Sequence, residues 1–95
     1  MIGTLQQNVT TAGTPVNPPA TAINSGIPIV IKAKRANTGD ISIGNSSVNA
    51  LNTAPNRFRL AANEAVSVRV ANLNEIWLDT TVNGEGVEIL YEPII

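Results

Sequence analysis

The feature that most constrains this chain is a strict alternation of apolar and polar residues from residue 27 onward. In "IPIVIKAKR" (27–35), Ile29 and Ile31 fall on one face and Lys32 and Lys34 on the other. Comparable runs follow at 40–44, 57–61, 66–73, 74–80 and 86–93, separated by loops rich in Asn and Gly. A period of two with turn signals every eight to twelve residues or so predicts an all-β fold. We expect a small antiparallel β-sandwich or barrel of about seven or eight short strands.

The alternation also predicts which side chains form the core. The inward set is Ile29, Ile31, Ile41, Ile43, Phe58, Leu60, Val66, Val68, Val70, Ile76, Leu78, Val87, Ile89 and Tyr91. A core of this size is adequate but small, since short domains bury a low fraction of their unfolded surface. We therefore expect oligomerisation to add stability.

The first 26 residues differ from the rest of the chain. They carry no charged side chain, and "TAGTPVNPPATAINSG" (11–26) contains prolines that cannot lie inside a sheet. We predict an extended N-terminal arm at 1–26 and a β-sandwich domain at 27–95, although "TLQQNVTT" (4–11) could pair as an edge strand. Because disordered tails are usually charged, an arm ordered on a partner protein is favoured over a free tail.

Composition argues against several classes of function. The chain has no cysteine and no histidine, so the usual nucleophile, general base and transition-metal ligands are missing. Six basic residues balance seven acidic ones, without the basic stripe of a nucleic-acid-binding protein. No apolar run is long enough to span a membrane. We expect no enzyme, no cofactor, no metal site, and no nucleic-acid or membrane partner.

The segment 74–93 contains the only tryptophan and reads as a hairpin around Asn83-Gly84. Ile76 and Leu78 point inward, so Trp77 points outward between acidic residues. A two-residue loop would place Trp77 opposite Leu90, and a four-residue loop would place it opposite Glu92. In either register, Trp77 and Leu90 share the outer face of one hairpin.

An outward tryptophan has three explanations: it faces a protein partner, the arm folds back over it, or it stacks on a ligand such as a sugar. Tryptophan is enriched at the centres of interfaces, which favours the partner. Trp77 would form an apolar patch with Val30 and Leu90, and acidic residues would surround this patch. The candidate interface residues are Leu5, Val9, Val16 and Ile23 of the arm, with Val30, Trp77 and Leu90 of the domain.

Charged residues give weaker signals. The acidic residues Asp79, Glu75, Glu88 and Glu92 could gather on one hairpin face, but they are more typical of a solvated strand. The basic residues Arg57, Arg59 and Arg69 would oppose them. A subunit with faces of opposite charge can dock head-to-tail on itself and close into a ring or trimer.

Three segments resemble a group of small virion proteins of tailed bacteriophages. They are "IVIKAKRANTGDISIGNSSVN", "RLAANEAVSVRVANLNEIWLD" and "GEGVEILYEP". The shared elements are an "A-N-T-G-x-I-x-I-G" hairpin at 36–44, "L-x-x-x-E-x-V-x-V" at 60–68, "N-L-N-x-I-W-L-D" at 72–79 and a final Tyr91-Glu92. The resemblance covers residues 27–93 and implies a compact β-sandwich with a structural role in the phage particle.

The resemblance leads to a specific expectation about function. We expect a capsid decoration, or cement, protein on the outside of the virion shell, clamping neighbouring copies of the major capsid protein as a homotrimer. A tail, baseplate or fibre-associated structural protein is the alternative. A host-surface or carbohydrate-binding module, with Trp77 as its stacking platform, is a third reading.

Overall fold

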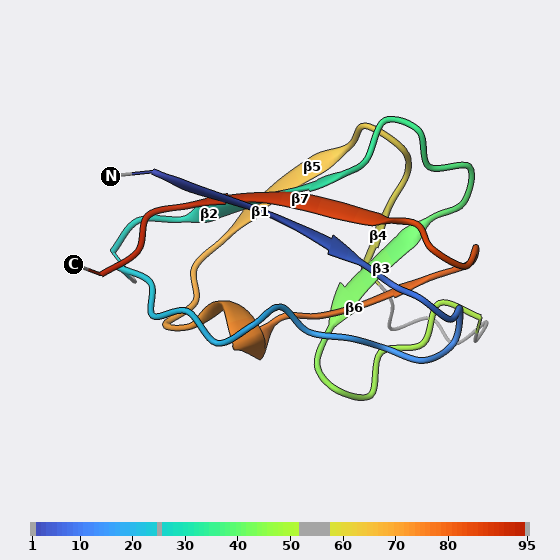
Figure 1. Cartoon of the computed structure of the whole chain (residues 1–95), viewed down its shortest axis with the longest axis horizontal. Helices are drawn as coiled ribbons and strands as arrows, with labels where there is room; N and C mark the ends of the chain where they lie inside the picture. Colours follow the sequence, from blue (N-terminus) through green and yellow to red (C-terminus); the bar gives the residue numbers. More distant parts are fainter. Residues whose placement is uncertain (1, 25, 52–57, 95) are drawn as a thin grey trace.

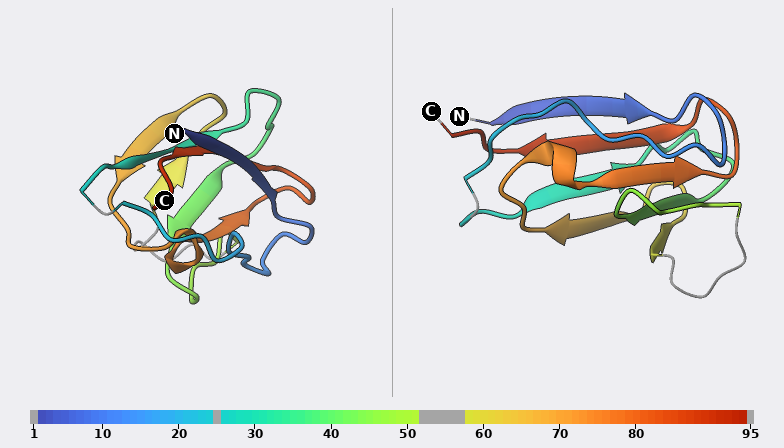
Figure 2. Two further views of the ribbon diagram at one scale, coloured as in Figure 1. Left: turned by 60° about the vertical axis from the view of Figure 1, so that its left-hand side comes forward. Right: turned by 90° about the horizontal axis from the view of Figure 1, so that it is seen from below.

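The computed structural model describes residues 2–24, 26–51 and 58–94, and it is all-β. Two antiparallel sheets face each other, as Figures 1 and 2 show. Sheet A has the order β1-β7-β2-β5 and sheet B the order β4-β3-β6. The strands are β1 (Gly3–Asn8), β2 (Ile29–Ala33), β3 (Ile41–Gly44), β4 (Phe58–Leu60), β5 (Ala65–Val68), β6 (Trp77–Thr80) and β7 (Gly86–Tyr91). The predicted sandwich is confirmed.

The core lies between the sheets and follows the predicted alternation. In β2, Ile29, Ile31 and Ala33 are fully buried, while Val30 and Lys32 between them are not. Their inward faces meet Ile41 and Leu78 of sheet B in a single apolar cluster. Period-two patterning therefore fixed the facing of these strands, because each strand has one side on the core.

Phe58 is the exception among the expected core residues that the structure describes. Its side chain is 52 % exposed. It is the first residue of β4, a three-residue strand at the edge of the smaller sheet. Alternation predicts the side of the strand on which a residue lies, but not whether the opposite sheet extends far enough to cover it.

The N-terminal segment is integrated into the sandwich, unlike the separate arm expected from the sequence. Its first part forms β1, which pairs with β7 from Gly3↔Tyr91 to Asn8↔Gly86. The rest runs in extended form beside sheet B, where Val16 and Leu78 exchange two backbone hydrogen bonds of 2.9 and 2.8 Å. Prolines prevent longer pairing there. The segment thus covers the edge of β6.

The segment 74–93 does not form the expected hairpin ladder. β6 belongs to sheet B and β7 to sheet A, so neither predicted register occurs. The turn at Asn83-Gly84 exists, with Gly84 at φ 83°. However, the Gly84 N–H donates to Val9 O at 2.7 Å, and Val9 N–H donates to Glu85 O at 2.8 Å. Because the turn bonds to Val9, it does not close a hairpin and instead connects β6 of sheet B to β7 of sheet A.

A short 3-10 helix at Leu73–Glu75 lies where the sequence predicts the end of one strand (66–73) and the start of the next (74–80). Asn72 caps it, and the Glu75 carboxylate accepts from Asn72 N–H at 2.8 Å, which completes a capping box. Leu73 is consequently turned into the core, where it is fully buried.

Candidate interaction surface

The outer face of sheet B is covered along β3 and β6 by loops of the same chain. Ser42 and Asp79 face each other across β3 and β6 on this side, and both are fully buried. The Asp79 carboxylate accepts from Gly13 N–H at 2.9 Å and from Ala50 N–H at 2.7 Å. Two separate loops are therefore held over the part of this face that β3 and β6 form, whereas Arg59 in the same row on β4 is exposed.

The outer face of sheet A is open. Its cross-strand rows follow from the register of four strands: one row runs Thr4–Leu90–Val30–Ser67, and the next runs Gln6–Glu88–Lys32–Ala65. Leu90 is 45 % exposed, and Val30 beside it is partly buried. We call the six central residues, Thr4, Gln6, Val30, Lys32, Glu88 and Leu90, the open face. It has an apolar row next to a charged row.

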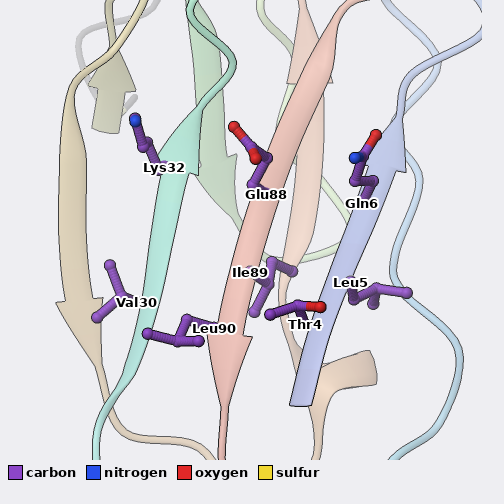
Figure 3. A pocket seen from close by; sticks show the side chains of 8 residues that line it. All are labelled: Thr4, Leu5, Gln6, Val30, Lys32, Glu88, Ile89 and Leu90. Atoms are coloured by element: carbon purple, nitrogen blue, oxygen red, sulfur yellow. The ribbon is translucent and has the colours of Figure 1, made fainter. Parts of the chain in front are cut away.

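Figure 3 shows these side chains standing over β1, β7 and β2. Together with the edges of Leu5 and Ile89, they line a shallow hollow of about 620 Å³. Across the sheet, Lys32 lies directly opposite Glu88, which places opposite charges on neighbouring strands. A groove beside it continues to Lys34 and Arg35. The apolar pair is thus bordered on one side by mainly polar residues, of which Lys32, Lys34 and Arg35 are basic.

Lys34 connects the two edges of this groove. Its ammonium group donates to Gln6 Oε1 at 2.9 Å and to Asn8 Oδ1 at 2.8 Å, although Lys34 follows β2 and both acceptors lie on β1. Gly86 of β7 lies between them, and its carbonyl accepts from Lys34 N–H at 3.1 Å. Because Gly86 has no side chain, the lysine can cross the intervening strand.

The interface residues expected on the arm lie against the chain's own core. Val9 and Ile23 are fully buried, and Leu5 and Val16 pack on the same cluster from its margin. In this structure their apolar surface covers the sandwich instead of a partner. The apolar spacing of the segment is used for contacts within the chain, which the sequence alone did not distinguish from contacts with a partner.

The expected patch of Val30, Trp77 and Leu90 is divided between the two sheets. Val30 and Leu90 are direct cross-strand neighbours on sheet A. Trp77 begins β6, opposite Gly44 in sheet B, and is partly buried on the side of the strand that also carries Asp79. The backbone of the N-terminal segment pairs with the next residue, Leu78. Of the three explanations for an outward tryptophan, this arrangement is most similar to the one in which the N-terminal arm folds back over Trp77.

The four acidic residues that were expected to share one hairpin face do not lie together. Asp79 is buried on sheet B, Glu75 caps the 3-10 helix, and Glu88 lies on the open face. In the described ranges, no group of three Asp, Glu, His or Cys side chains could hold a metal ion. Of the basic residues expected to oppose them, Arg57 lies outside the described residues.

Sequence reasoning missed Thr4, Gln6, Lys32 and Glu88 as parts of one surface. The signal was present in "GTLQQN", an uncharged run that can pair as a strand, but the residues with which it pairs lie 78 to 88 positions further along the chain. Only the register with β7 brings Thr4 beside Leu90.

Compared with known proteins, the chain matches no family model, no curated protein and no solved structure. Within the described ranges, the structure contains no helix with the length and apolar composition needed to cross a membrane. The chain is therefore characterised by its fold, an all-β protein of two antiparallel sheets with one open face.

Proposed function

We propose that this protein is a structural component of a tailed-bacteriophage virion, and specifically a capsid decoration protein that binds the outside of the shell. The proposal combines the resemblance at residues 27–93 with the open face of sheet A. Val30 and Leu90 give that face an apolar centre, and Gln6, Lys32 and Glu88 give it a polar border. An apolar centre with a polar rim is the usual anatomy of a protein interface.

The open face is the one structural observation that supports the proposal. A four-stranded sheet normally buries both faces or exposes a polar one. Here loops held at Asp79 cover the outer face of the three-stranded sheet along β3 and β6, whereas the larger sheet leaves Leu90 almost half exposed. The contact with the major capsid protein is accordingly assigned to the open face.

This assignment changes the mode of attachment expected from the sequence. The N-terminal segment covers its own core, so the clamp consists of a rigid sheet surface. Rigid surfaces lose less conformational entropy on binding than arms that fold on a partner. Many weak contacts repeated over a shell lattice would still give strong retention.

The first test is the copy number of the chain in purified virions, measured by quantitative mass spectrometry against the major capsid protein. Copies in the hundreds, in a fixed ratio to the capsid protein, are expected for a decoration protein. Six or twelve copies per particle would contradict the shell assignment and favour the tail or baseplate alternative. Absence from washed particles would contradict the virion proposal as a whole.

The second test locates the contact. Leu90→Asp places a charge at the apolar centre of the open face and should reduce binding to particles lacking the protein at least tenfold. Val82→Asp is the matched control, because Val82 is 38 % exposed but lies in the turn that links the sheets. Equal binding by the two variants would remove the open face from the proposal.

A further inference from the structure

The free edge of sheet A is the feature that the proposed function does not use. β1 is the outermost strand of that sheet in the described part of the chain, and its six residues, "GTLQQN", include no charged side chain and no proline. Sheet edges are normally protected by charges, prolines or bulges, because their unpaired backbone groups recruit other strands. This edge carries none of the three.

The hydrogen-bond pattern shows which groups of β1 face outward. Val9 exchanges backbone bonds with the turn that precedes β7, at 2.8 Å to Glu85 O and 2.7 Å from Gly84 N. In an antiparallel pair, alternate residues bond the same neighbour. Leu5 and Gln7 therefore bond β7 as Val9 does, and Thr4 and Gln6 direct their N–H and C=O groups away from the sheet.

The opposite edge of the sheet provides a comparison. β5 is two residues shorter and is followed directly by Arg69, whose position places it in the outward-bonding set of that strand. Ser67 on β5 lies in the same cross-strand row as Thr4 and is likewise exposed. Arg69 thus places a charge at one end of the β5 edge, whereas the residues of β1 itself are all uncharged.

We infer that β1 pairs with β1 of a second copy of this chain, antiparallel about a twofold axis that passes between the two Leu5 residues. This inference does not depend on the virion assignment. In that register Thr4 of each copy lies opposite Gln6 of the other, and the outward N–H and C=O groups of both residues are satisfied reciprocally. The two four-stranded sheets become one sheet of eight strands.

Self-complementarity selects this occupant. β1 has no charged residue of its own to repel a second β1, and a twofold contact needs only one surface. At the axis, the two Leu5 side chains become direct cross-strand neighbours, which adds an apolar contact on the inner side of the sheet. The pairing is isologous and closed, so it gives a dimer in place of the homotrimer expected from the sequence.

The test begins with the mass of the full chain in solution, measured by sedimentation velocity over a range of protein concentrations. A species of about twice the 10.0 kDa of one chain should appear as concentration rises. Thr4→Lys should weaken the dimer at least tenfold. The new cation would lie opposite Gln6 of the second copy, whose amide oxygen already accepts from the Lys34 ammonium group, so two cations would be brought close together. Ser67→Lys, the same change of charge on the other edge, should shift the dissociation constant less than twofold.

The register is tested with single cysteines, since the native chain has none. Leu5→Cys should form an interchain disulfide on mild oxidation, because residues facing each other at the axis have neighbouring Cβ atoms. Gln7→Cys, which is not opposite its own copy, should not. A wild-type chain that stays monomeric throughout, or dimerisation that Ser67→Lys abolishes and Thr4→Lys does not, would overturn the inference. Cross-linking of Gln7→Cys alone would overturn the register.

Discussion

At the scale of single residues, the Asp79 carboxylate holds two loops onto sheet B. Oδ1 accepts from Gly13 N–H and from its neighbour Thr80 N–H at 2.8 Å, and Oδ2 accepts from Ala50 N–H. Hydrogen bonds from backbone amides to a carboxylate are stronger than those between neutral groups. Asp79 therefore links two segments that are distant in sequence to one point of the sheet.

The Asp79→Asn variant should lose about 2–4 kcal/mol of unfolding free energy, because an amide NH₂, which is itself a donor, would face one of these backbone N–H donors. Urea denaturation followed by tryptophan fluorescence measures the loss. Asp40→Asn removes the same charge from a carboxyl with no such set of donors and should change stability by less than about 0.5 kcal/mol. Equal effects would show that charge, and not loop anchoring, is what matters at position 79.

Glu85 makes a comparable link between two turns, but at the surface. Burial opposes its charged form, and hydrogen bonds from Thr38 N–H, Gly39 N–H and the Thr38 hydroxyl outweigh that effect, so the net pKa of Glu85 is lowered. A lowered folded-state pKa stabilises the fold above the ordinary value of 4.5, and this contribution is lost as pH falls through the folded-state pKa.

Glu85→Gln should therefore lower stability slightly at neutral pH and reduce the loss of stability on acidification below 4.5. The measurement is the urea midpoint of both proteins at neutral pH and at several acidic values. Because Glu85 is largely solvated, the effect is small. Parallel pH profiles for the two proteins would contradict the role assigned to this carboxylate.

At the scale of elements, β1 and β7 approach so closely that only glycine fits at their junction. A Cβ on Gly86 would collide with the carbonyl oxygen of Gln7 and would lie 2.7 Å from Asn8 Cα. These are backbone atoms, so a rotamer change cannot relieve the overlap. The same absence of a side chain lets Lys34 cross β7 to reach β1.

Gly86→Ala should destabilise the protein by about 1–3 kcal/mol and loosen the pairing of β1 with β7. Thermal unfolding gives the first effect, and faster amide hydrogen exchange in β1 gives the second. Gly26→Ala is the matched change, because its new methyl group would meet only Asn24 Oδ1 at 3.5 Å. It should be neutral or slightly stabilising.

At the scale of the whole molecule, the N-terminal segment is a structural part of the sandwich. It supplies the edge strand of sheet A, pairs with β6 of sheet B, and buries Val9 and Ile23 in the core. No disulfide stabilises the chain, since it contains no cysteine. A small domain without such a cross-link has a low free energy of unfolding, so the loss of a few contacts can unfold it.

Deletion of residues 1–24 should therefore abolish cooperative unfolding at room temperature. Circular dichroism and NMR chemical-shift dispersion of the shortened chain provide the measurement. The loss follows from exposing β7 along one edge and uncovering the apolar cluster beneath Ile23. A shortened chain that keeps a sharp transition would restore the interpretation of this segment as a separate arm.

The sequence by itself determined the fold class and the facing of most strands, because side chains of a half-buried strand must alternate. Ile29, Ile31, Leu78 and Ile89 could be assigned to the core on that basis, and all four are fully buried. Alternation is a property of each strand's own sequence, so it can be recognised without knowing which strands pair.

Only the tertiary structure decided which strands share a sheet and which outer face stays open. The pairing of β1 with β7, the separation of β6 from β7 and the burial of Asp79 all depend on contacts between distant segments. A turn such as Asn83-Gly84 can close a hairpin or connect two sheets, and competing backbone donors and acceptors elsewhere select the outcome. Here Val9 supplies them, and Trp77 and Leu90 consequently lie on different sheets.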